Sequence, residues 1–117
     1  MIISQNEQGS YEWKEERHES IGGTTLKDLM VNKPVEESAL YYSLIASHTE
    51  PFFDEETFIN TAMQRGTDLE PSARFEGSQY LNLEFFEFGT CRREGFPLNH
   101  CSPDGFTRDL KDGTEIK

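Results

Sequence analysis

The sequence predicts an α+β fold, within the broader α/β class, in which helices come first and strands follow. Apolar residues recur at helical spacing over residues 35–48, aromatic and polar residues alternate over residues 80–88, and Asp-Gly turns separate the segments after residue 100. A chain of 117 residues has room for one small domain. We therefore expect a single domain over residues 1–117, helical over residues 10–77 and rich in β-structure over residues 78–117.

The first two helices are predicted from their capping residues. Residues 10–19 form a strongly helical run that begins with a serine cap. Residues 21–25 interrupt this run, and Thr24 or Thr25 then caps a second helix. Asn32-Lys33-Pro34 ends that helix.

The next two helices are predicted from apolar spacing. Residues 35–48 give the clearest amphipathic pattern, and residues 49–51 break it. Asp54 then caps a helix that continues past Gly66, and Pro71 is expected to bend or restart it.

The strands follow in short segments. Residues 80–88 read as an aromatic strand, and residues 89–95 as a turn or the start of a partner strand. Residues 97–106 form an extended segment with a turn-like Pro-Asp-Gly, and residues 110–117 form a turn followed by a strand.

The composition indicates a globular protein with a thin core. Only 34% of residues are hydrophobic, although 12% are aromatic, and 22 acidic residues outnumber 11 basic ones to give a net charge of −11. This acidity argues against nucleic-acid binding, because phosphate contacts need Lys and Arg. No stretch approaches the ~18 apolar residues of a membrane span, and the N-terminus lacks the pattern of a secretory signal. We expect a soluble, cytoplasmic protein without a membrane partner.

The two cysteines leave three interpretations open. Cys91 and Cys101 are favoured as reduced structural thiols, because the sequence shows no export signal. They could instead pair with each other, or bind zinc together with a histidine such as His100.

Two carboxylates and a lysine stand out near the C-terminus. Asp104 precedes a glycine, and Glu115 and Lys117 flank Ile116, so on a strand residues 115 and 117 would share one face. Carboxylates held together attract a hard cation such as Mg²⁺, which can activate water and stabilise charge on a phosphate. In an arbitrary acidic chain, the same trio is more often a solvated hairpin.

Four blocks in order resemble the YqaJ viral recombinase family, the lambda-exonuclease group of the PD-(D/E)XK nuclease superfamily. They are Trp13 to Arg17 with Ile21-Gly22-Gly23-Thr24, then Arg65 to Glu70 with Ala73-Arg74, then Cys101-Ser102-Pro103-Asp104-Gly105, and finally Glu115-Ile116-Lys117. The resemblance spans residues 11–117. It implies a restriction-endonuclease-like core with N-terminal helices packed on a small mixed sheet.

The resemblance also implies roles for individual residues. Asp104 and Glu115 are implied as ligands of catalytic Mg²⁺ ions, with Mn²⁺ as a substitute, together with the Ile116 carbonyl. Glu70 is implied to complete that site, directly or through water, and Lys117 is implied to position the attacking water. A further pair, Arg17 and Thr24, is implied to hold the terminal 5′ phosphate of the cut strand.

Each role has a plainer alternative. Arg17 could form i,i+4 pairs on a solvated helix, Thr24 is expected to cap a helix in either interpretation, and Glu70 could be a surface residue. Asp104-Gly105 is also a common turn dipeptide.

The implied activity is 5′ to 3′ hydrolysis of duplex DNA from its ends, in a phage or prophage-encoded enzyme of a bacterial host. The resemblance further implies a homotrimer and a single-strand annealing protein as partner. Because family members continue beyond the motif lysine, we expect a C-terminally truncated member with weak or no activity alone. The alternative is a small acidic interaction protein or DNA mimic that binds a basic protein surface. That alternative predicts that Asp104, Glu115 and Lys117 do not converge.

Overall fold

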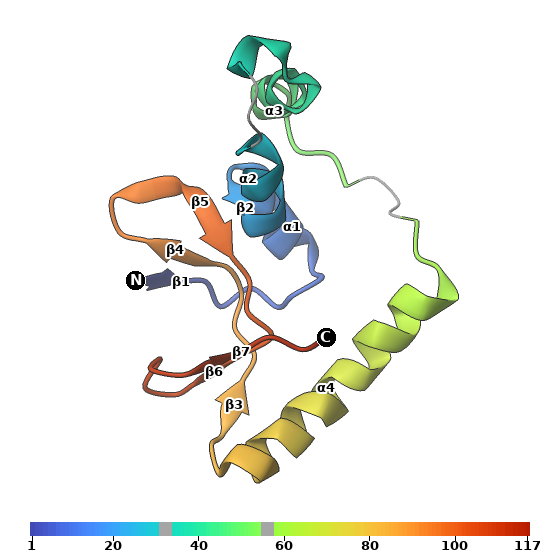
Figure 1. Ribbon diagram of the computed structural model, residues 1–117, viewed down its shortest axis with the longest axis vertical. Coiled ribbons are helices and arrows are strands. Elements are labelled where there is room, and N and C mark those ends of the chain that lie inside the picture. The colour runs from blue at the N-terminus through green and yellow to red at the C-terminus, as the bar shows by residue number, and fades with distance from the viewer. Residues whose placement is uncertain (31–33, 55–57) are drawn as a thin grey trace. The chain divides into compact units, whose positions relative to one another are not determined.

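The computed structural model describes residues 1–30, 34–54 and 58–117, and this part of the chain contains both helices and short strands (Figure 1). The chain divides into two compact units. The first unit comprises residues 1–54 and 89–102, and the second unit comprises residues 55–88 and 103–117. The single-domain assignment stays a prediction.

The first unit contains a four-stranded mixed sheet. Its strands lie in the order β1 (Ile2–Ile3), β4 (Cys91–Arg93), β5 (Phe96–Cys101) and β2 (Ile21–Gly22). Residues 89–95, predicted as a turn or the start of a partner strand, contain β4, so the partner strand is confirmed. The chain then reverses at Gly95, whose φ of 80° lies in the left-handed region that favours glycine. β2 runs parallel to β5 and places Gly22 opposite His100.

Helix α1 confirms the first predicted cap, whereas helix α2 corrects the second. α1 (Tyr11–His18) begins after Ser10, whose hydroxyl accepts a hydrogen bond from Trp13 N at 3.2 Å. α2 (Gly23–Leu29) has Gly22 as its cap, so neither Thr24 nor Thr25 caps it. The helix starts earlier than expected because the extended backbone of β2 ends at Gly22. The predicted stop at residues 32–33 lies outside the described residues.

The third helix also starts at a different residue from the one expected. Residues Val35–Glu37 form a short 3-10 turn, η1, and α3 (Ala39–Thr49) follows it. Ser38 caps α3, because its hydroxyl accepts a hydrogen bond from Tyr41 N at 3.2 Å.

The second unit begins with the long helix α4 (Thr61–Leu81). Asn60 caps it by accepting a hydrogen bond from Met63 N at 2.9 Å, so the expected cap at Asp54 is wrong. The helix continues through Pro71 without stopping, although proline removes one backbone donor. The strand expected over residues 80–88 is therefore too long. α4 runs to Leu81, and Asn82 in the left-handed conformation (φ 51°) ends it.

A three-stranded antiparallel sheet completes the second unit. Its strands lie in the order β3 (Phe85–Phe86), β6 (Gly105–Thr107) and β7 (Gly113–Thr114). β7 ends at Thr114, so residues 115–117 are not the predicted strand. The prediction that residues 115 and 117 share one face of a strand is wrong for the same reason.

The hydrophobic core is thin, as the composition predicts. Phe85 and Cys91 are the apolar side chains that are buried among the described residues, and many large apolar side chains are exposed. No helix in the described ranges combines the length and the apolar character that crossing a bilayer requires.

Candidate functional site

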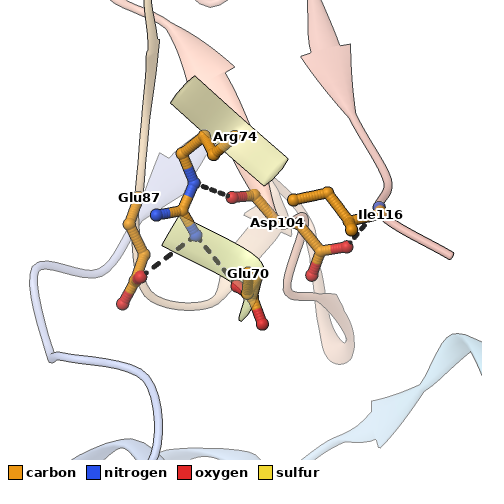
Figure 2. Close-up of polar contacts among 5 residues, drawn as sticks. All are labelled: Glu70, Arg74, Glu87, Asp104 and Ile116. Carbon is orange, nitrogen blue, oxygen red and sulfur yellow. Dashed lines mark hydrogen bonds and ion pairs between the residues drawn. The ribbon is translucent and has the colours of Figure 1, made fainter. Parts of the chain in front are cut away.

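The end of the chain meets the start of β6 in the second unit. Asp104 lies immediately before β6, and the pairing of Gly105 with Thr114 brings residues 115–117 beside it. The Asp104 carboxylate accepts a hydrogen bond at Oδ2 from Ile116 N at 2.6 Å (Figure 2). This bond orients the carboxylate through Oδ2, and Oδ1 takes no part in it.

Arg74 joins α4 to this carboxylate. Its Nε donates to the Asp104 carbonyl oxygen at 2.6 Å, and its Nη2 donates to Glu70 Oε1 at 2.8 Å and Glu87 Oε2 at 3.2 Å (Figure 2). Only 12% of the Arg74 side chain is exposed. Because the Arg74 guanidinium is shielded from solvent and bonds three oxygen atoms, it holds Glu70, Glu87 and the Asp104 carbonyl in place. We call Glu70, Arg74, Glu87, Asp104 and residues 115–116 the carboxylate cluster.

Negative charge is concentrated in the carboxylate cluster. Burial raises the pKa of Glu70, the carboxylates of Asp104, Glu87 and Glu115 raise it further, and the Arg74 guanidinium lowers it. One guanidinium therefore does not neutralise the surrounding acidic groups. A divalent cation would supply the missing positive charge.

The structure brings together most of the predicted catalytic residues. Asp104 and Ile116 are in direct contact. The negative charges of Asp104 and Glu115 both raise the pKa of the Glu70 carboxyl. Lys117 is exposed, and within the described part of the chain it makes no hydrogen bond or ion pair. The solvated-hairpin interpretation does not account for the contacts of Asp104 with both α4 and the chain end.

Sequence reasoning assigned no role to Arg74 or Glu87. The spacing of Glu70 and Arg74 at i and i+4 on one helix was the available signal for their ion pair. No local pattern indicates Glu87, because its partner lies 13 residues away along the chain.

The donor chemistry of the carboxylate cluster fits Mg²⁺, which prefers oxygen ligands. The elevated Glu70 pKa is the observation that supports this fit. However, within residues 1–30, 34–54 and 58–117 no group of three or more His, Cys, Asp or Glu side chains is arranged to hold a metal ion. Glu70 in particular is held by Arg74, so its role as a metal ligand stays a prediction.

The predicted phosphate-binding residues lie in the first unit. Arg17, on α1, stacks its guanidinium over the Trp13 ring at 4.2 Å from the centroid. Burial lowers the pKa of Arg17, and no carboxylate in the described part of the chain forms an ion pair with it. The solvated-helix interpretation of Arg17 therefore has no support. Thr24 is exposed in the first turn of α2.

Comparison with solved structures finds an exonuclease. The crystal structure of an alkaline exonuclease, LHK-Exo, from Laribacter hongkongensis matches with a TM-score of 0.63 and 28% identity, over 86% of this chain and 49% of that chain. LHK-Exo in complex with dAMP matches with the same TM-score and 26% identity, over 84% and 48% of the two chains. The chain thus spans about half the length of these proteins. The predicted α+β fold class is confirmed.

The search of curated proteins found no match. Among family models, that of the YqaJ-like viral recombinase domain matches residues 12–117. This match includes the carboxylate cluster and both predicted phosphate-binding residues. The chain therefore belongs to the YqaJ-like viral recombinase domain family.

Proposed function

We propose that this chain carries the active-site carboxylates of a metal-dependent exonuclease that hydrolyses duplex DNA in the 5′ to 3′ direction. The observation that carries the proposal is the contact of the Asp104 carboxylate with the 115–116 peptide, beside Glu70. Family membership and the likeness to an alkaline exonuclease support it.

Asp104, Glu115, the Ile116 carbonyl and Glu70 are the residues that would hold Mg²⁺ or Mn²⁺. A bound ion supplies Lewis-acid stabilisation of charge on the phosphate and lowers the pKa of water. The Ile116 amide orients Asp104 by the hydrogen bond to its carboxylate. The ammonium of Lys117 would donate to the attacking water and hold it against the phosphorus.

Arg17 and Thr24 would hold the terminal 5′ phosphate of the substrate. The guanidinium offers bidentate donors to phosphate, and its position on Trp13 limits its freedom before substrate arrives. Recognition of a terminal phosphate would direct hydrolysis to DNA ends. A homotrimer and a single-strand annealing partner are further parts of this proposal, and they rest on family membership alone.

The proposal is tested by incubating linear duplex DNA with the protein and Mg²⁺. Because this chain alone is predicted to have weak or no activity, any cleavage is expected to be slow and to be abolished by EDTA. Glu115→Ala should lower that rate by at least about 100-fold, since the loss of a charge-stabilising group costs ~3 kcal/mol or more of transition-state stabilisation. Glu84→Ala is the matched control, because Glu84 is exposed and outside the carboxylate cluster. Equal cleavage by Glu115→Ala and the unchanged protein contradicts the catalytic assignment.

Metal binding is measured separately by thermal unfolding, so that slow turnover does not obscure the result. Mn²⁺ should raise the melting temperature by mass action, and Asp104→Asn should abolish that rise. If Mn²⁺ has no effect on the melting temperature and the unchanged protein cleaves DNA no faster than Glu115→Ala, the acidic interaction protein becomes the better interpretation.

A further inference from the structure

A buried histidine of the first unit has no assigned role. His100 lies on β5 and is only 8% exposed, and Ser20, which is also buried, contacts it. The Ser20 hydroxyl lies 2.7 Å from His100 Nδ1, although the two residues are 80 positions apart in the sequence. This contact occupies one ring nitrogen and orients the imidazole.

The other ring nitrogen is buried without a partner. Among the described residues, His100 Nε2 is one of the few buried side-chain atoms that lack a hydrogen bond. Leaving such a group unpaired costs free energy, so it indicates a missing ligand or water.

This nitrogen and the Arg17 guanidinium face the same space beside Gly22. A Cβ atom built on Gly22 would lie 3.2 Å from His100 Nε2 and 3.9 Å from Arg17 Nη2. The pairing of Gly22 with His100 between β2 and β5 brings them together. Glycine at this position keeps the space open, and any other side chain would fill it.

The charges around this space favour an anion. The charges of Arg17 and Arg92 both lower the pKa of His100, and the Glu16 carboxylate raises it. Glu16 is already engaged, since it accepts hydrogen bonds from Thr90 and Asn6. Arg17 has no ion pair with any carboxylate that the structure describes. A half-buried guanidinium and a buried imidazole that face one space form a suitable site for a phosphate oxygen.

We propose that His100 donates a hydrogen bond from Nε2 to the terminal phosphate of the DNA strand, beside Arg17, with Ser20 selecting the required tautomer. When the Ser20 hydroxyl donates to Nδ1, the neutral ring carries its proton on Nε2. His100 then discriminates a phosphomonoester end from a hydroxyl end. The inference rests on the proposed function, because it assigns a positioning residue to the terminal-phosphate site.

The first test uses the unchanged protein and NMR of its three histidine rings. Titration with dAMP should shift the His100 resonances and raise the His100 pKa, because the phosphate charge stabilises imidazolium. Deoxyadenosine should do neither, and inorganic phosphate should act more weakly than dAMP if a DNA end is the ligand. The rings of His18 and His48 serve as internal controls. A His100 ring that does not respond to dAMP overturns the inference.

The second test measures binding of 5′-phosphorylated and 5′-hydroxyl duplexes by fluorescence anisotropy in EDTA. His100→Leu should weaken binding of the phosphorylated duplex at least about tenfold, the effect of one hydrogen bond to a charged group, and leave the hydroxyl duplex unchanged. His100→Gln, which keeps a donor, should restore much of this loss. Equal weakening for both duplexes indicates a merely structural role and overturns the inference.

The outcomes separate this inference from the proposed function. If the unchanged protein does not distinguish the two duplexes and Arg17→Ala has no effect, the terminal-phosphate site itself fails. If Arg17→Ala removes the preference and His100→Leu does not, only the role of His100 fails. Should His100→Leu not fold, the dAMP titration of the unchanged protein decides.

Discussion

At the scale of single residues, burial shifts the pKa of a carboxyl in one unit and of an imidazole in the other. The carboxyl of Glu70 has a raised pKa, mainly because of burial, and the imidazole of His100 has a lowered pKa for the same first reason. In both cases the folded protein disfavours the charged form. Groups with shifted pKa values are frequent at functional sites, where a bound ligand can supply the charge or hydrogen bond that stabilises the charged form.

The His100 environment predicts how stability depends on pH. An unfolded histidine takes up a proton near pH 6.5, whereas the folded state resists protonation of His100 because burial, Arg17 and Arg92 lower its pKa. Stability is therefore complete above about pH 6.5 and falls as the pH drops below that value, by at most ~1.4 kcal/mol per pH unit.

Urea unfolding between pH 7.5 and pH 5.5 measures this effect. His100→Gln should flatten the decline, and His48→Gln, which changes an exposed ring on α3, should not. The raised pKa of Glu70 acts in the opposite direction, because it removes stability as the pH rises. The comparison of variants isolates the histidine. An equal slope for His100→Gln and the unchanged protein would show that His100 is not the group responsible.

At the scale of elements, helix α4 supplies the support for the carboxylate cluster. Glu70 and Arg74 lie one turn apart on it, and Arg74 contacts the Asp104 carbonyl 30 residues further along the chain. Pro71 sits inside the same turn and does not end the helix. Glu70 is therefore placed by the continuity of α4 together with Arg74, which follows it one turn later.

Removal of Arg74 tests this support. Arg74→Ala should lower the free energy of unfolding by about 2 kcal/mol, because it leaves the Asp104 carbonyl unpaired and the Glu70 and Glu87 carboxylates uncompensated. Arg65→Ala, an exposed arginine of the same helix, is the control and should change it by less than ~0.5 kcal/mol. Chemical denaturation gives both values. Arg74→Ala as stable as the control would mean that the contacts of Arg74 contribute little.

At the scale of the whole molecule, the net charge of −11 bears on the proposed binding of DNA. Part of the acidity is used within the fold, where Arg74 pairs with Glu70 and Glu87. The remaining charge repels the phosphate backbone. In the proposed function, affinity for DNA would then come from a few placed donors and from divalent cations rather than from a basic surface.

The salt dependence of DNA binding tests this view. In EDTA, binding of a phosphorylated duplex should be weak, with a slope of log K against log salt of only about −1 to −2, because few cationic contacts are made. Arg17→Ala should reduce the magnitude of this slope by about 1, and Arg65→Ala should leave it unchanged. Fluorescence anisotropy across a salt series provides the slopes. A steep slope for the unchanged protein would reveal an extended basic surface and contradict the expectation.

The sequence by itself determined the features that depend on near neighbours. The Ser10 cap of α1, the reversal at Gly95 and the four ordered blocks that carry the family resemblance were all readable from the chain. The Ser10 cap and the turn at Gly95 involve contacts over a few residues, so local patterns were sufficient there, whereas the expected caps of α2 and α4 were wrong. The roles of Asp104 and Glu115 as metal ligands stay predictions of the sequence.

Only the tertiary structure decided where the elements begin and which side chains meet. β2 forms because β5 offers it hydrogen-bond partners, and α4 extends to Leu81 where aromatic alternation indicated a strand. Arg74 reaches the Asp104 carbonyl across 30 residues, and Ser20 reaches His100 across 80. Backbone pairing and burial between distant segments override local propensity. No periodic pattern in the sequence indicates which distant segments will meet.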